Sequence, residues 1–191
     1  MLFGEKVFID TEYIIKMQHE IAGDLVQWLK IEMESESIRG DYTKLLCKSE
    51  EIKIRGETVF FGTGYLIFSG DGKIKQLYLG AEESIVLREE SVLAADITTE
   101  GEPLSTNYLS LVTLSGPGAV FIHGDGDFAE FYLEKGETVE VRTSCITAMD
   151  STVTYQLGSR FSTLSGPGAV LLQSSIPEEE ESKEFPFLDR T

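Results

Sequence analysis

Apolar and polar residues alternate in short segments along much of this chain, and glycine-containing segments separate them. Within residues 128–141, for example, apolar side chains lie two positions apart at Phe131 and Leu133, and again at Val139 and Val141. A period of two is typical of strands that bury one face. Strands of about five residues, separated by turns about every eight to ten residues, predict an all-β fold built from antiparallel sheet.

The same pattern is present twice, because residues 62–96 and 116–150 align without a gap at an offset of 54 positions. Of the 35 aligned positions, 11 are identical, and most of these are glycines, turn residues or apolar strand positions. Repetition of such residues indicates that a folding unit has been duplicated and not a reaction centre.

Each copy begins with a glycine-rich segment that we predict to be a turn. Where this segment contains Gly-Pro-Gly, proline fixes φ at one position and glycine accepts the positive φ that a type II turn needs next. Later in each copy, an Asp-Gly step within residues 70–72 and 124–126 predicts a β-hairpin. The predicted structural turn residues are Gly62, Gly64, Gly116, Pro117, Gly118, Gly166, Pro167 and Gly168.

A third copy is divided between the two ends of the chain. Residues 165–170 repeat residues 115–120 letter for letter, but no Gly-Asp turn follows them, whereas residues 21–24 carry the matching turn near the start. We therefore predict that the last strand, at 166–172, lies beside residues 21–33 and joins the first repeat. Such closure gives three repeats with pseudo-threefold symmetry and removes free sheet edges.

This interpretation divides the chain into an N-terminal extension, a single body and an acidic tail. Residues 12–30 also carry apolar side chains at helical spacing, so helix and strand both stay open there; the repeat favours strands. The predicted boundaries are 1–20 for the extension, 21–173 for the body and 174–191 for the tail, with repeats at about 21–60, 61–113 and 114–164 and with 165–173 completing the first.

Composition limits the classes of function. The 191 residues are 41% hydrophobic, which suits a folded protein with a buried core. A formal net charge of −17 argues against a nucleic-acid partner, because phosphate binding needs clustered Lys and Arg. Cys47 and Cys145 have no metal-site or disulfide spacing, no apolar run approaches a membrane span, and the first residues resemble no leader, so we expect a cytoplasmic location.

Three motifs together resemble a known family. They are Ile21-x-Gly23-Asp24-x-x-Gln27, the segment Leu114-Ser115-Gly116-Pro117-Gly118 with its copy at 164–168, and Glu134-Lys135-Gly136-Glu137. Over about residues 20–173 the chain resembles the altered-inheritance-of-mitochondria family of the TRAP-like superfamily, which is named after the tryptophan RNA-binding attenuation protein. The resemblance implies three shortened double-stranded β-helix units in one chain. It implies no catalytic residues, and RNA binding does not carry over because this chain has no Lys-rich turn cluster.

His123, Asp125 and Asp127 are the only candidates for a metal site. A histidine with two carboxylates could hold a divalent cation, but Ca²⁺ prefers six to eight oxygens and Zn²⁺ needs several His or Cys. The other copy has Ser69-Gly70-Asp71-Gly72-Lys73, which keeps the turn residues and loses the ligands. We therefore predict a structural turn, with no metal, no cofactor and no catalytic residues.

Three functional hypotheses follow. The first is a non-enzymatic β scaffold that associates with itself as a homo-oligomer or with an unknown protein. The second is a module that binds a small ligand between repeats. The third is an enzyme of unrecognised type, which would need a deep cleft that brings His123 near carboxylates of another repeat. The acidic tail with Phe185–Leu188 is either a solvated end or a docking segment.

Overall fold

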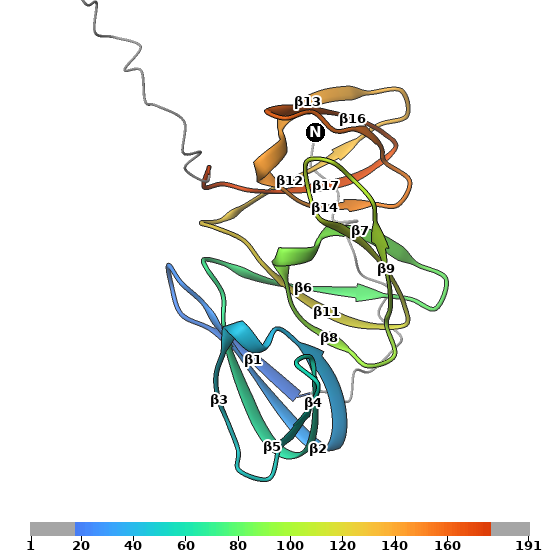
Figure 1. Ribbon diagram of the computed structural model, residues 1–191. Coiled ribbons are helices and arrows are strands. Elements are labelled where there is room, and N and C mark those ends of the chain that lie inside the picture. The colour runs from blue at the N-terminus through green and yellow to red at the C-terminus, as the bar shows by residue number, and fades with distance from the viewer. Residues whose placement is uncertain (1–17, 177–191) are drawn as a thin grey trace, which may run out of the picture.

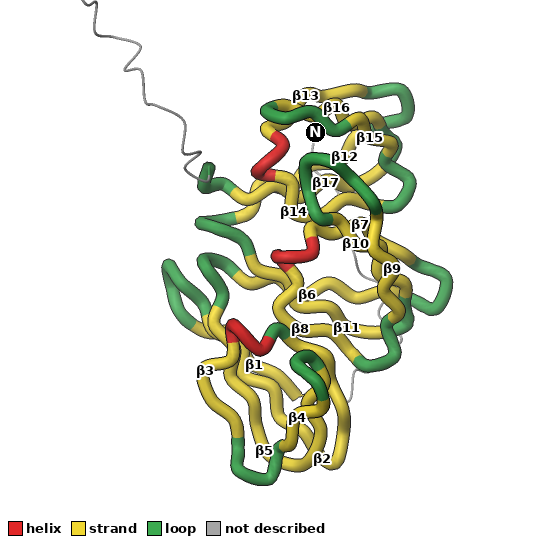
Figure 2. The backbone as a smooth tube through the Cα atoms, in the orientation of Figure 1, coloured by secondary structure: helices red, strands yellow, loops and turns green. Residues whose placement is uncertain are grey.

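A computed structural model describes residues 18–176, and nearly all of their regular structure is β-strand (Figure 1, Figure 2). The predicted all-β class is confirmed. Three 3₁₀ helices of three residues each are the only helices among residues 18–176, and none is long enough to span a bilayer. The elements are β1 (Gln18–Ala22), β2 (Trp28–Gly40), η1 (Tyr42–Lys44), β3 (Leu45–Lys48), β4 (Lys53–Arg55), β5 (Val59–Ser69), β6 (Ile74–Leu79), β7 (Ser84–Arg88), η2 (Glu89–Ser91), β8 (Val92–Asp96), β9 (Glu100–Leu104), β10 (Leu111–Ser115), β11 (Gly118–His123), β12 (Phe128–Leu133), β13 (Thr138–Arg142), η3 (Thr143–Cys145), β14 (Ile146–Asp150), β15 (Thr154–Gln156), β16 (Phe161–Ser165) and β17 (Gly168–Gln173).

All strand pairs are antiparallel, and one set of pairings occurs three times along the chain. We call these sets the first strand group (β2 to β5, residues 28–69), the second (β6 to β11, residues 74–123) and the third (β12 to β17, residues 128–173). In each group the first strand pairs with the last one. The equivalent pairs are Met33↔Gly64, Leu79↔Gly118 and Leu133↔Gly168.

Neighbouring groups share sheets. The end of β2 pairs with β8 of the second group, where Arg39 lies opposite Ala95. In the same way β7 pairs with β14 of the third group, where Val86 lies opposite Met149. The six-stranded sheet β12-β17-β14-β7-β10-β9 therefore takes three strands from each of two groups. The result is a stack with β3 near one end and β13 at the other (Figure 1).

The hydrophobic core crosses the boundaries between the groups. Phe60 and Phe68 of the first group are fully buried in one cluster with Leu93 and Phe121 of the second. A second cluster contains Leu87 of the second group together with Ala148 and Leu171 of the third. A third cluster, on the other face of the same sheet, contains Val86 together with Met149 and Val170. Because each core takes side chains from two groups, the described residues form one cooperative body.

The last strand does not join the first repeat, so the predicted closure is wrong. Strand β17 pairs with β12 and β14, where Val170 lies opposite Phe131 and Met149. The third group contains its own first strand, β12, which is in register with β17 over six residue pairs. This partner is close in sequence, so residues 165–173 complete the third group and not the first.

The two Asp-Gly turns are not hairpins. They connect β5 to β6 and β11 to β12, and neither of these strand pairs is hydrogen-bonded as a ladder. The turns instead carry the chain from one group to the next. The partner of each strand lies tens of residues away along the chain and not across the turn, since β5 pairs with β2, β6 with β11 and β12 with β17.

The two Gly-Pro-Gly segments lie where the chain passes from a strand of one sheet into a strand of another, from β10 to β11 and from β16 to β17. Gly118 and Gly168 have φ of +151° and +147°, far from the roughly +80° of the glycine in a type II turn, so these turns are not of the predicted type. Gly62 and Gly64 have φ of +132° and +134° and lie inside the continuous strand β5, so the turn predicted at these two residues is not formed.

The first third of the described chain is strand. Strands β1 and β2 cover residues 18–22 and 28–40, which decides between the two interpretations of that region in favour of strands from residue 18 onward. Gly23, with φ of +103°, lies in the turn between them. The segment 1–17 and the tail from 177, with Phe185–Leu188, lie outside the described residues.

We expect Gly118→Val to destabilise the protein by more than ~1 kcal/mol. A Cβ atom at this position would lie 2.8 Å from Cβ of Asp96 and 2.9 Å from Cγ2 of Thr99, in a conformation with positive φ. Urea unfolding followed by circular dichroism measures the loss. Gly136→Val is the matched control, because Gly136 also has a positive φ but has no atom within 4 Å of its Cβ position. Equal losses for both variants would contradict the role of close packing at residue 118.

Candidate functional site

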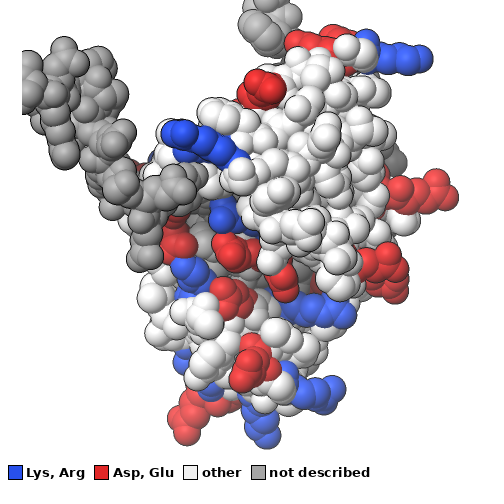
Figure 3. All heavy atoms as spheres, turned by 45° about the horizontal axis from the view of Figure 1, so that its top comes forward, with Lys and Arg blue, Asp and Glu red and all other residues white. Residues whose placement is uncertain are grey.

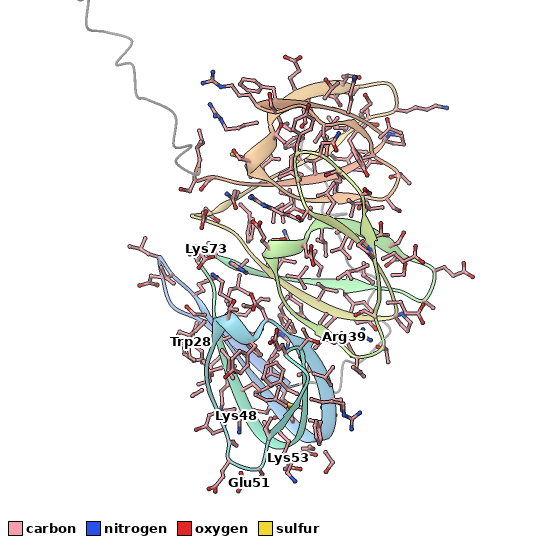
Figure 4. All side chains as sticks on the ribbon, viewed as in Figure 1. Trp28, Arg39, Lys48, Glu51, Lys53 and Lys73 are labelled. Atoms are coloured by element: carbon pink, nitrogen blue, oxygen red, sulfur yellow. The ribbon has the colours of Figure 1, made fainter. Side chains whose placement is uncertain are left out.

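The connections between the strand groups stack on one another at one side of the molecule. Gly70 donates its N–H to the carbonyl of Gln27 at 2.8 Å, and Lys73 donates to the carbonyl of Gly126 at 2.8 Å. The N–H of Gly124 donates to the backbone carbonyl of Lys73 at 3.2 Å. The ammonium group of Lys73 adds a bond of 2.7 Å to the carbonyl of Asp24 (Figure 4). These bonds explain why both turns contain glycines, because their backbones pair directly and leave no room for a Cβ atom at Gly72.

His123 lies beneath this stack at the end of β11. Its side chain is 4% exposed, and its Nδ1 accepts a hydrogen bond of 3.2 Å from the backbone N–H of Asp71. Nε2 therefore carries the proton of the neutral ring, and it is buried without a hydrogen-bond partner within the described part of the chain. Burial lowers the pKa of His123, although the carboxylate of Asp71 at 3.5 Å partly opposes this shift.

Of the three predicted metal candidates, His123 and Asp125 line the same small hollow, whereas Asp127 is not part of its lining. Asp125 receives contacts through its backbone, from Gln173 and Ser175, and the carboxylate of Asp127 accepts a hydrogen bond from the N–H of Phe128 at 2.8 Å. Within residues 18–176 no group of three or more His, Cys, Asp or Glu side chains could hold a metal ion.

His123 borders a small hollow between the second and third groups. The hollow has a volume of about 70 Å³ and is also lined by Arg88, Glu90 and Gln173. Arg88 donates to the carbonyl of Ser144 at 2.7 Å and forms an ion pair with Glu90 at 3.2 Å. Since one water occupies about 30 Å³ in the liquid, this space suits a few waters and not an organic ligand.

A much larger groove lies between the first and second groups. Its volume is about 900 Å³, and its walls come from the end of β2, from η1 and η2, and from β8. Val92, Ala94, Ala95 and Leu114 give it an apolar floor. The residues with charged or aromatic side chains around it are Arg39, Asp41, Tyr42, Glu57, Glu89 and Glu90.

The lining of this groove carries more acidic than basic side chains. The lining holds four carboxylates and one guanidinium; Glu90 is paired with Arg88, and the guanidinium of Arg39 donates to the carbonyl of Thr99. An apolar floor with an acidic rim matches a ligand that has both a hydrocarbon part and a positive charge. Arg39 is labelled between the two groups in Figure 4.

Sequence reasoning missed the groove. Its lining comes from segments about 50 residues apart that meet only when β2 pairs with β8. No motif marks these segments, and the acidic pair Glu89-Glu90 reads as an ordinary solvated turn in the sequence. The one usable signal was the expectation that a ligand site would lie between repeats.

Comparison with known proteins agrees with the motifs. A family described as mitochondrial biogenesis AIM24 matches residues 4–175. An X-ray structure of a Streptococcus pyogenes protein matches with a TM-score of 0.74 and 18% identity, and the match covers 84% of this chain and 94% of that one. At this identity the likeness shows a shared fold. No curated protein matches the chain.

We expect the stability of the protein to fall as the pH decreases from about 7 to about 5, in part because of His123. A lowered pKa in the folded state means that the unfolded chain binds the proton first, so protonation favours unfolding. Urea midpoints at several pH values measure this slope. His123→Gln should flatten the slope of stability against pH, because it removes the titrating ring. Glutamine is chosen because it is the natural residue at the equivalent position 173 of the third group. An unchanged slope in that variant would contradict this role of His123.

Proposed function

Because the chain belongs to the mitochondrial biogenesis AIM24 family, whose description names no reaction, we propose that it is a non-enzymatic β scaffold that works through protein contacts, including contacts with its own copies. One observation carries this proposal: the sheets are open, and strands at both ends of the stack have only one partner strand within residues 18–176. An unpaired strand edge offers backbone donors and acceptors to another strand.

The architecture that fits this role consists of three TRAP-like, shortened double-stranded β-helix units placed one after another. The threefold recurrence of the strand pairings supports this interpretation. Consecutive units that share sheets make a rigid body, and a rigid body can hold two binding edges at a constant separation. We further propose that the protein works in the cytoplasm without a cofactor and without a nucleic-acid partner, in keeping with its net charge of −17.

The groove between the first and second groups supports a second candidate function, the binding of a small ligand. The apolar floor and the acidic rim favour a cationic amphiphile over an anionic metabolite. In this case the scaffold would present or sense a ligand at a junction between two groups.

Native mass spectrometry of the protein, tagged at its own locus and purified at its natural level, separates the two candidates. We expect assemblies heavier than a single chain, made of this chain alone or with a defined second protein. A small molecule that is retained under native conditions and released on denaturation would favour the ligand-binding function. A single chain without protein or small-molecule partners would contradict both.

A further inference from the structure

Two strands at opposite ends of the stack lack the partner that their equivalents have. Inside the chain, β8 and β14 each pair with a strand of the preceding group, and β2 and β7 each pair with a strand of the following group. Within residues 18–176, β3 pairs only with β5, and β13 pairs only with β16. The first group has no predecessor for β3, and the third has no successor for β13.

The strands at the two ends of the stack correspond to the two halves of one internal sheet. A complete internal sheet has the order β12-β17-β14-β7-β10-β9, in which the first three strands come from one group and the last three from the preceding group. At the top of the stack, β13-β16-β15 is such a second half alone. At the other end, β2, β5 and β3 supply the matching first half, in the order that would place β3 beside β13.

Residues on β3 are exposed at positions that are buried in both internal junctions. Leu46 is 62% exposed, whereas the residues aligned with it, Leu93 and Thr147, are each 0% exposed. Cys47 is also exposed, and its equivalents Ala94 and Ala148 are 0% and 2% exposed. A leucine on an unpaired edge strand is a site for association.

The opposite end shows the same contrast. Phe161 on β16 is 51% exposed, while Leu111, at the equivalent position of β10, is 2% exposed because the third group covers it. Figure 3, in which this end of the molecule comes forward, shows a broad area without charged side chains in its upper half. Each end therefore exposes a large apolar side chain, Leu46 or Phe161, at a position that a neighbouring group covers in the internal junctions.

The internal junctions also predict the register in which β13 would pair with β3. Arg39↔Ala95 and Val86↔Met149 are equivalent pairs, and the same rule places Glu140 of β13 opposite Lys48 of β3. One position along, Val141 falls opposite Cys47. Glu140 is exposed, so the rule places opposite charges face to face.

The surroundings of Lys48 fit this pairing. Its ammonium group donates to the carbonyl of Ile52 at 2.7 Å. The equivalent carbonyl in the second group is that of Thr99, which accepts from Arg39 of the preceding group. Lys48, labelled in Figure 4, thus fills a position where an internal junction also has a cation. A carboxylate on an approaching β13 would neutralise its charge.

We propose that copies of this chain associate head to tail, with β13 of one copy paired antiparallel to β3 of the next, so that a six-stranded sheet is completed across the junction. This inference rests on the proposed scaffold function and specifies the partner, the strands and the register. The contact is heterologous, so it generates a ring if the rotation between copies closes and a filament if it does not.

Disulfide trapping tests the register. Val141→Cys should form a disulfide with the natural Cys47 of the next copy under mild oxidation, because opposed Cα atoms in antiparallel strands lie about 4.5–5.5 Å apart. Non-reducing electrophoresis should show a ladder of dimers and higher species. Val139→Cys is the matched control, since it lies on the same face two positions out of register. Adding Cys47→Ser to Val141→Cys should abolish the ladder.

Charge reversal tests the pairing without new cysteines. Glu140→Lys and Lys48→Glu should each weaken self-association at least about tenfold in sedimentation experiments, and both changes in one chain should restore it. Unfolding curves of the single variants establish that each still folds. Equal weakening in the double variant would overturn the assigned register.

The outcomes separate this inference from the scaffold proposal. Assemblies that form but give no ladder with Val141→Cys overturn the head-to-tail junction and leave the scaffold function standing. Single chains with no protein partner overturn both. Single chains in which Cys47 resists thiol reagents would show that the β3 edge is already covered within one chain, and this result also overturns the head-to-tail junction.

Discussion

Antiparallel pairing between consecutive strand groups is the constraint on which the rest of this structure depends. A strand that exposes its N–H and C=O groups on one side must find a partner or leave them to water. Here the end of β2 pairs with β8 of the second group and β7 pairs with β14 of the third, so the sheet at each internal junction is built from two groups. The cores follow the sheets, because side chains from two groups meet on each face.

Close backbone approach explains where glycine is required. At Gly72, an added Cβ would lie 2.5 Å from backbone atoms of Gly124 and Gly126, so the two connecting turns can stack only without side chains at these positions. The repeated Gly-Asp-Gly sequence therefore reflects contact between successive connections. Asp71 then supplies the N–H that holds His123 in one tautomer.

Both hollows of interest arise at junctions. The small polar one lies where the second group meets the third, and the large acidic groove lies where the first meets the second. Sheets that share strands leave gaps where 3₁₀ turns replace strand, and the side chains of those turns differ from group to group. Such gaps can acquire a binding role without any change in the scaffold, which keeps function separate from the repeated residues.

The sequence by itself determined the all-β class, the family and the presence of a repeated unit. Alternating apolar positions and glycines are local signals, and the pairs Gly62/Gly116 and Gly64/Gly118 could be aligned without knowledge of any contact. Only the tertiary structure decided which strands pair. The match of residues 21–24 to the Gly-Asp turns suggested closure onto the first repeat, but register depends on contacts between residues tens of positions apart, and β12 provided the last strand with a nearer partner. The groove could not be predicted from the sequence either, because its walls become neighbours only when β2 pairs with β8.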